Sequence, residues 1–351
     1  TQNFTSFQQI TTATNWLKVA PSYFHTIALK ADGTIWGWGR NDNYQTGNAP
    51  ATLNQLIPLQ IGTDTDWIEI ATGTSSTSFA IKSNGTIWGW GSNPTSIIVS
   101  GSGTTTVSTP TQVGTDTDWV KMSVGGQHIL AQKQDGTLWS WGRNDKHQLG
   151  LNSTVGSIHY PTQVGVDTDW AKVFCSASGS LALKSNGTLW VWGTAAWFSF
   201  SSNNEGFVPQ QVGTDTDWID ISASHGPYFA IKSNGTLWTW GDSTNQSYFG
   251  FFGNGFPDTN NYENGPVQVG TDSDWIKVKN SSNRVIALKE NGTIWVWGNN
   301  LHVDLGLGIS GNQFTPQQLG TQTNWIDIGI TGSRFYARNS NEQLFHWGNY
   351  L

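Results

Sequence analysis

The sequence has few charged residues, a single cysteine and no long hydrophobic run. Charged residues make up 12% of the 351 positions, with 17 Lys and Arg against 24 Asp and Glu. This balance argues against nucleic acid as a partner, because phosphate backbones are bound by clustered basic side chains. Cys175 has no partner for an intrachain disulfide, and we expect a small buried thiol there. No apolar run approaches the roughly 18 residues of a membrane-spanning helix, so we expect no membrane insertion.

Motifs of catalysis and metal binding are also missing. The seven His are scattered, and no Ser, His and Asp set, Gly-rich phosphate loop or Cys pair stands out. His25 and His128 occupy matching positions in two copies of a repeat, where we favour a structural hydrogen bond over catalysis. The sequence therefore predicts a protein that is not an enzyme and that has no cofactor and no metal site.

What the sequence has in abundance is one repeated hairpin, clearest at residues 184–193, K-S-N-G-T-L-W-V-W-G. Asn-Gly or Asp-Gly lies at the turn in six copies and predicts a two-residue type I′ turn. The seventh copy has Asn341-Glu342 instead and should turn less readily. Apolar residues at consecutive positions predict strands buried on both faces. The other copies end at Gly39, Gly91, Gly142, Gly241, Gly298 and Gly348.

Two further markers recur with the hairpin: a Trp that precedes it and a short P-x-Q strand that follows it. The Trp returns every 48 to 57 residues, which is the period of a propeller blade. The sequence therefore predicts an all-β fold, a seven-bladed propeller of four-stranded antiparallel blades in a single domain over residues 1–351. The expected blades are 16–66, 67–118, 119–169, 170–217, 218–274, 275–324, and 325–351 together with 4–12.

The two ends of the chain complement each other. The last unit stops after its third strand, whereas residues 7–10 form a P-x-Q-like strand with no blade before it. We predict that this N-terminal strand becomes the outer strand of the last blade. The pairing closes the ring and covers an edge that would otherwise favour aggregation.

The repeat resembles that of the regulator of chromosome condensation family. Residues 22–47 carry the pattern best, with H-T-I-A-L-K at 25–30, D-G-T-I-W-G-W-G at 32–39, Asn41 and Q-T-G at 45–47. The resemblance implies a seven-bladed propeller closed by its two termini, and a binding scaffold. The founding member is an exchange factor for a small GTPase, whereas a secreted member inhibits β-lactamases through aromatic loops on one face. The Asn-, Thr- and Trp-rich acidic composition is similar to that of secreted bacterial members, so we expect a secreted or cell-surface protein.

The candidate binding site lies on the face where the repeat varies. All length variation falls between the W-x-W-G strand and the P-x-Q strand, and loops on a rigid scaffold are where binding usually resides. The segments after the fourth and fifth hairpins are rich in aromatic residues, which suits a protein-binding hot spot or a sugar-stacking platform. The alternative is that they fold back as a cluster over the blade rims. The residues concerned are Trp197, Phe198, Phe200 and Phe207, and Tyr248, Phe249, Phe251, Phe252, Phe256 and Tyr262.

Five of the linkers between units carry an Asp-x-Asp pair. Paired carboxylates are possible Ca²⁺ ligands, but Asp also closes turns, and we favour the structural interpretation. For the whole chain we predict a non-enzymatic scaffold that binds a protein, with a glycan as the alternative ligand. We expect a monomer or a module of a larger assembly. The pairs are Asp64 and Asp66, Asp116 and Asp118, Asp167 and Asp169, Asp215 and Asp217, and Asp272 and Asp274.

Overall fold

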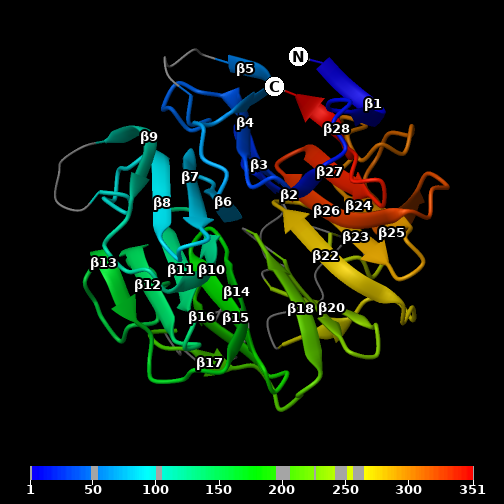
Figure 1. The fold of residues 1–351 in the computed structure, drawn as a ribbon. Helices are drawn as coiled ribbons and strands as arrows, with labels where there is room; N and C mark the ends of the chain where they lie inside the picture. Colours follow the sequence, from blue (N-terminus) through cyan, green and yellow to red (C-terminus); the bar gives the residue numbers. More distant parts are fainter. Residues whose placement is uncertain are drawn as a thin grey trace.

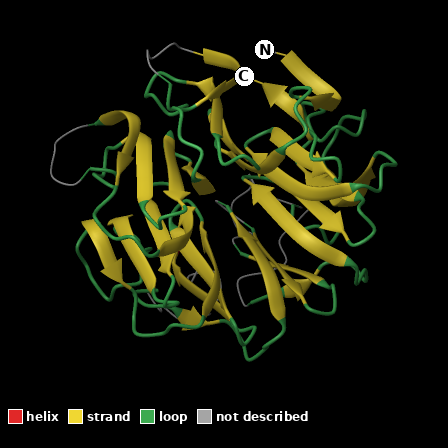
Figure 2. Cartoon of the chain, viewed as in Figure 1, coloured by secondary structure: helices red, strands yellow, loops and turns green. Residues whose placement is uncertain are grey.

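The chain forms a ring of seven four-stranded antiparallel blades around a central channel (Figures 1 and 2). The computed structural model describes residues 2–48, 54–99, 105–194, 206–224, 227–241, 251–255 and 265–350. The sequence-based prediction of a seven-bladed propeller is confirmed. In each blade the first strand packs against the first strands of the neighbouring blades, so these strands line the channel.

The 28 strands follow the repeat in order. Blades 1 and 2 contain β2 (Trp16–Pro21), β3 (His25–Lys30), β4 (Ile35–Arg40), β5 (Asn54–Gln60), β6 (Trp67–Gly73), β7 (Thr77–Lys82), β8 (Ile87–Ser92) and β9 (Thr106–Gln112). Blades 3 and 4 contain β10 (Trp119–Val124), β11 (His128–Lys133), β12 (Leu138–Arg143), β13 (Ser157–Gln163), β14 (Trp170–Cys175), β15 (Gly179–Lys184), β16 (Leu189–Gly193) and β17 (Gln210–Gln211). Blades 5 and 6 contain β18 (Trp218–Ala223), β19 (Tyr228–Lys232), β20 (Leu237–Trp240), β21 (Val267–Gln268), β22 (Trp275–Ser281), β23 (Arg284–Lys289), β24 (Ile294–Gly298) and β25 (Gln313–Leu319). Blade 7 contains β26 (Trp325–Thr331), β27 (Arg334–Asn339), β28 (Leu344–Tyr350) and β1 (Gln2–Gln9).

The N-terminal strand closes the ring as predicted. β1 pairs antiparallel with β28, with Gln2 opposite Tyr350 and Gln9 opposite Phe345. The ring of Phe7 lies 4.9 Å from that of Trp325 and 4.8 Å from that of Trp347, measured between centroids. The closure therefore rests on backbone pairing and on an aromatic contact within blade 7.

The hairpin turns differ from the predicted type. Gly33 has φ +75°, but Asp32 before it is not among the residues with positive φ, and Gly33 N–H donates to the Lys30 carbonyl. This is a type I turn followed by a left-handed glycine, the usual three-residue hairpin, so the type I′ prediction was wrong. The Asp32 side chain explains the choice, because its Oδ1 accepts hydrogen bonds from both N–H and Oγ of Thr34.

Six of the hairpin turns have glycine at this left-handed position, and the seventh has Glu342. A Cβ on Gly33 would lie 2.0 Å from the Thr65 carbonyl oxygen of the next linker. Glu342 holds the same position in blade 7 with φ +58°. We therefore expect Glu342→Gly to raise the free energy of unfolding by about 0.5–1 kcal/mol, because it removes left-handed strain from a side chain. Chemical denaturation of both proteins measures this, and an unchanged or lower stability contradicts it.

The Asp-x-Asp pairs are lysine clamps. In blade 4 the ammonium of Lys184 lies 2.7 Å from Asp167 Oδ2 and 3.1 Å from Asp169 Oδ1. It also lies over the rings of Trp170 and Trp190, 4.9 and 4.7 Å from their centroids. Burial lowers the pKa of Lys184, but the hydrogen bonds with the two carboxylates outweigh it and raise that pKa. The same clamp recurs at Lys82, Lys133, Lys232 and Lys289.

These contacts refine the structural interpretation of the Asp-x-Asp pairs. Each pair surrounds a cation that the chain itself supplies, rather than bonding only to turn backbone as we had expected. Blade 1 has the lysine, Lys30, over Trp16 and Trp36, but Ala13 and Asn15 in place of the acids. Blade 7 replaces both partners, with Asn324 in the linker and Asn339 at the lysine position.

The clamp gives a prediction with a matched control inside the chain. We expect Lys184→Met to lower the free energy of unfolding by about 1–2 kcal/mol, because it removes the cation from two rings and leaves two carboxylates facing each other. Lys30→Met removes a cation from two rings without exposing a carboxylate pair, so its loss should be smaller. Equal losses in the two variants, measured by urea unfolding, contradict a contribution from the Asp pair.

Two further expectations concern the environment of Cys175 and the presence of membrane-spanning helices. Cys175 is buried at the end of β14, its Sγ donates to the Ser123 carbonyl at 3.2 Å, and burial raises its pKa to about 12. The thiol is structural, as predicted. Within the described residues, no helix is long and apolar enough to cross a membrane.

Candidate binding face

The face with variable loops is built on a buried asparagine. Two residues after the W-x-W-G strand, Asn41 Oδ1 accepts from Thr46 N–H at 3.1 Å and its Nδ2 donates to the Asn48 carbonyl at 2.8 Å. The same two bonds tie the loops at Asn93, Asn144 and Asn300, which are all at most 1% exposed. One side chain thus ties the start of each loop to two later positions of the same loop.

Exposed apolar side chains lie on these anchored loops, close to the positions that the asparagines bond. Val155, Leu301 and Ile309 are 57%, 64% and 53% exposed, although their loops start from fully buried asparagines. Phe24, in the neighbouring loop between β2 and β3, is 42% exposed. Anchored loops that carry exposed apolar side chains are typical of a binding surface.

Among the described residues, five of these loops are also bonded to a Trp of the next blade. Trp90 Nε1 donates to the Gln45 carbonyl at 3.1 Å, and Trp192 Nε1 donates to the Gln148 carbonyl at 2.9 Å. In blade 5 the equivalent acceptor is the Phe251 carbonyl, bonded to Trp297 Nε1 at 3.0 Å. Phe251-Phe252-Gly253 therefore replaces the Q-x-G of the repeat.

This placement corrects part of the predicted site. Phe251 and Phe252 are each 3% exposed, so their rings pack inside the blade junction and do not form an exposed platform. Phe207 is half-buried and lies against His147 of the preceding blade's loop, with 3.7 Å between ring centroids. The remaining candidates lie outside the described residues: Trp197, Phe198, Phe200, Tyr248, Phe249, Phe256 and Tyr262.

Blades 4 and 5 also lack the anchoring asparagine. The positions two residues after Gly193 and Gly241 are Ala195 and Ser243, where the other blades with a full loop have Asn. The two aromatic segments are therefore the ones without the side chain that ties both ends of the loop. This was visible in the sequence as a broken N-x-x-x-Q-x-G pattern, and it separates these segments from the rest of the face.

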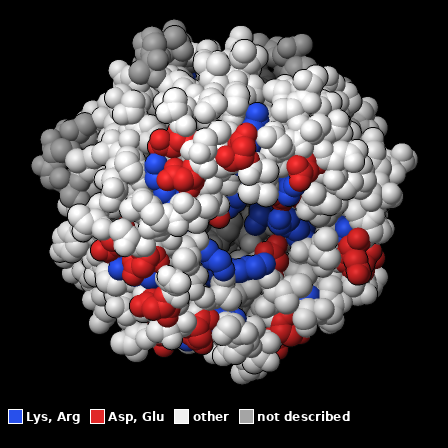
Figure 3. All heavy atoms as spheres, viewed as in Figure 1, with Lys and Arg blue, Asp and Glu red and all other residues white. Residues whose placement is uncertain are grey.

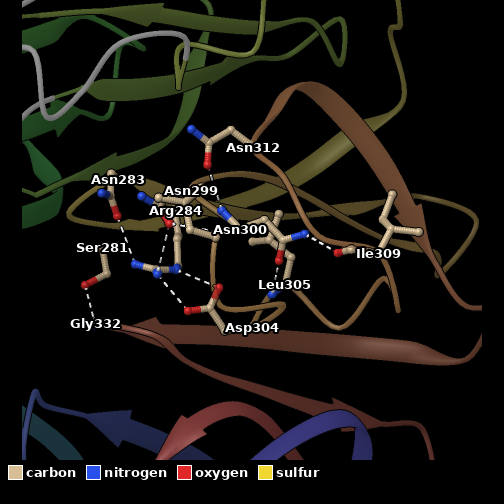
Figure 4. Close-up of polar contacts among 11 residues, drawn as sticks. Ser281, Asn283, Arg284, Asn299, Asn300, Asp304, Leu305, Ile309, Asn312 and Gly332 are labelled. Carbon is tan, nitrogen blue, oxygen red and sulfur yellow. Dashed lines mark hydrogen bonds and ion pairs between the residues drawn. The ribbon is translucent and has the colours of Figure 1, made fainter.

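Blade 6 carries a buried ion pair that the sequence analysis missed (Figure 4). Arg284 is 7% exposed and donates to both carboxylate oxygens of Asp304, Nε at 3.1 Å and Nη2 at 2.7 Å. Asn283 and Asn299 accept further guanidinium bonds. Arg284 occupies the position that His25 has in blade 1, and Asp304 occupies the position of Gln45. These two replacements by oppositely charged residues could have revealed the ion pair from the sequence.

The two repeat histidines make structural hydrogen bonds, as predicted. Ser78 Oγ donates its hydrogen to the Gln45 carbonyl at 2.8 Å, so it accepts from His25 Nε2 at 2.7 Å. His128 and Ser180 repeat the relay in blade 3. Burial holds the pKa of His25 at about 3 and that of His128 at about 4, which keeps both neutral.

The opposite end of the channel carries a ring of exposed aliphatic residues. Every first strand has a register irregularity just after its marker Trp, and the extra residue points outward there. Ala171 interrupts the ring, and beside it a groove of about 450 Å³ runs between blades 4 and 5. The sequence analysis missed this ring because a bulge breaks strand alternation. The exposed members, 38–49% accessible, are Leu17, Ile68, Val120, Ile219, Ile276 and Ile326.

Curated relatives match about half of the chain. Protein pim1 of Schizosaccharomyces pombe is 34% identical over 193 residues, 49% of this chain and 35% of its own length. The mitochondrial RCC1 domain-containing protein RUG3 of Arabidopsis thaliana is 27% identical over 188 residues, 50% of this chain and 42% of its own. The chain thus spans less than half the length of either relative.

Solved structures match nearly the whole ring. Human WBSCR16 covers 97% of this chain and 89% of its own, with a TM-score of 0.78 and 17% identity. Prp20p from Saccharomyces cerevisiae, described with its binding properties to Gsp1p and histones, covers 96% and 83%, with a TM-score of 0.76 and 18% identity. At these identities the likeness shows the fold.

Family models match the repeats themselves. Two models of the regulator of chromosome condensation (RCC1) repeat match, one over residues 32–80 and 135–183 and one over 17–45 and 119–148. The matched segments contain the hairpin, the marker Trp and the histidine positions described above. With the seven-bladed ring, they confirm the predicted resemblance to the regulator of chromosome condensation repeat family.

Proposed function

We propose that this protein is a non-enzymatic scaffold that binds another protein through its variable face. The observation that carries the proposal is that buried Asn anchors hold loops whose apolar side chains are exposed, as at Asn300, Leu301 and Ile309. Such loops are preorganised, so binding costs little ordering of the backbone. Prp20p, a structural neighbour, is described with protein ligands, which supports the same class of function.

The aromatic segments of blades 4 and 5 are the proposed specificity elements of this face. They differ from the other loops in length, in aromatic content and in lacking the Asn anchor. Within them, Phe251 and Phe252 act as buried attachment points, and Trp197, Phe198 and Phe200 are the proposed contact residues. A glycan that stacks on these aromatics is the alternative ligand. The composition remains the basis for proposing secretion or surface display.

The test is affinity capture combined with a glycan array. We expect the wild type to retain a protein partner, and Trp197→Ala/Phe200→Ala or Leu301→Ser/Ile309→Ser to lose it at least about tenfold, the scale of a hot-spot truncation. The matched control is Ile219→Ser/Ile276→Ser, which removes two exposed aliphatic side chains from the opposite face.

The loop variants, the opposite-face control and the glycan array together distinguish the possible binding sites and ligands. Loss of the partner only in the opposite-face variant would move the site to the aliphatic ring. A glycan-array signal that depends on Trp197, without a protein partner, would favour the lectin. Retention of the partner by all variants with intact melting curves would reject this face as the binding surface.

A further inference from the structure

The channel has three tiers of side chains contributed by the seven first strands. The tier nearest the linkers is charged, the middle tier is formed mainly by small residues, and the end tier is rich in hydroxyls. Residues two positions apart on a strand share a face, so each strand adds one side chain to each tier. Figure 3 looks down the ring and shows Lys and Arg gathered around the central hollow, with Asp and Glu mostly further out.

The charged tier uses all of its carboxylates. Lys172 pairs with Asp220 at 2.9 Å, Lys277 pairs with Asp327 at 2.5 Å, and Lys18 pairs with Glu69. Lys121 donates instead to the Ala171 carbonyl at 3.1 Å. The channel therefore has five lysines from first strands, counting Lys279 of the middle tier, against three carboxylates. The surplus is positive although the whole chain is acidic.

Lys279 is the unbalanced charge of the middle tier. Its Nζ lies 5.4 Å from the ring centroid of Phe174, two blades away, and no carboxylate of the described residues lies within ion-pair distance of it. Burial lowers the pKa of Lys279. The nearby charges of Asp220 and Asp327 act in the opposite direction, whereas those of Lys277 and Lys172 lower this pKa further. An ammonium held here is stabilised by an anion.

A hydroxyl-lined cavity of about 120 Å³ lies at the end of the channel, and all seven blades contribute to it. Phe174, whose ring lies beside the Lys279 ammonium, forms part of its wall, so the lysine is separated from the cavity by this ring's edge or by a change of its own rotamer. Ser281 Oγ accepts from Gly332 N–H at 2.7 Å (Figure 4), and Ser224 Oγ accepts from Ser282 N–H at 2.7 Å. Each backbone N–H occupies one lone pair of its serine oxygen, so both hydroxyls keep their own hydrogen as a donor for a group in the cavity.

We propose that this cavity binds an oxyanion, a carboxylate or a phosphate, held by Lys279 and by the hydroxyls of Ser224 and Ser281. The volume admits a tetrahedral anion with a few waters and is well below the roughly 300 Å³ at which drug-sized ligand sites begin. The cavity lies where the first strands end, at the same face as the loops between first and second strands. A free anion and the acidic side chain of a bound protein both have the chemistry it takes. The proposal stands independently of the protein-binding function.

The experiment titrates inorganic phosphate, and separately succinate, by calorimetry and thermal shift at ionic strength matched with sodium chloride. We expect saturable binding to the wild type in the millimolar range and at least tenfold weaker binding to Lys279→Met. Ser224→Ala/Ser281→Ala should weaken it severalfold. The control Lys146→Met removes one exposed loop lysine and the same net charge, and it should bind like the wild type.

Two results overturn the proposal: no saturable binding of either anion to the wild type, or equal binding to Lys279→Met. If Lys279→Met does not fold, side-chain NMR of lysine-labelled wild type replaces it. The Lys279 Nζ or Cε resonance must then move during the phosphate titration, and a fixed resonance overturns the proposal. A competition experiment identifies where the bound anion comes from. If phosphate displaces the captured protein, the cavity binds an acidic side chain of that partner. If phosphate does not displace it, the cavity binds a free anion.

Discussion

Deletion of residues 1–12 should lower the melting temperature by at least about 5 °C and cause aggregation. The deletion removes the backbone partner of β28, which pairs from Phe345 to Tyr350. It also removes Phe7 from its contacts with Trp325 and Trp347. Differential scanning calorimetry and light scattering measure the two effects.

The control for this deletion keeps the strand and moves its covalent connection. Because Gln2 lies opposite Tyr350, a short Gly-rich linker from residue 351 to residue 1 would make β28 and β1 a hairpin. A permuted chain that starts at residue 13 should therefore recover most of the lost stability. An unchanged melt after deletion, or no recovery in the permuted chain, contradicts closure by β1.

Acid should destabilise the protein in a pH range set by buried histidines. Burial lowers the pKa of His25 to about 3, and those of His128 and His346 to about 4, against the ordinary value of 6.5. The unfolded chain takes up these protons below pH 6.5 and the folded chain does not, so stability falls as pH falls. The loss continues until the folded pKa values are reached.

The expected slope is large for three groups acting together. Between pH 6 and 4.5 we expect the free energy of unfolding to fall by about 4 kcal/mol per pH unit from these histidines. His25→Gln/His128→Gln leaves one such group and should reduce the slope to about 1.4 kcal/mol per unit. The control His302→Gln replaces an exposed loop histidine. An equal slope in the double variant and the wild type, from urea unfolding at each pH, contradicts the assignment.

The architecture could be predicted from the sequence because the same strand pattern recurs seven times. A marker Trp, a hairpin and a P-x-Q strand at nearly constant spacing predict a blade, and the missing fourth strand after Trp347 predicts the partner at residues 7–10. The turn type did not follow. An Asn-Gly pair suits both type I′ and type I with a left-handed glycine, and the Asp32 to Thr34 bonds decide between them only in three dimensions.

The site was harder to predict, since packing and exposure are not written in the repeat pattern. Aromatic content alone did not distinguish the buried Phe251 from an exposed contact residue. Alignment of Phe251-Phe252-Gly253 with the Q-x-G of the other repeats predicts that Phe251 is buried. The lysine clamp could have been predicted from the sequence. Blade 7, which lacks the Asp-x-Asp pair, also lacks the lysine that corresponds to Lys184, and this joint loss indicates that the two interact. The cavity at the end of the channel depends on seven strands meeting at one axis, which no single unit contains.

The most direct test of the account is a hydrogen-exchange footprint of the complex with the captured protein partner. Backbone amides that change on binding report which face is covered. The account predicts protection in residues 194–208, 242–265 and 299–312, with the hairpin turns and the Asp-x-Asp linkers unchanged. Protection confined to the linkers and to the aliphatic ring around Ile219 and Ile276, with no change in the loops, would contradict it.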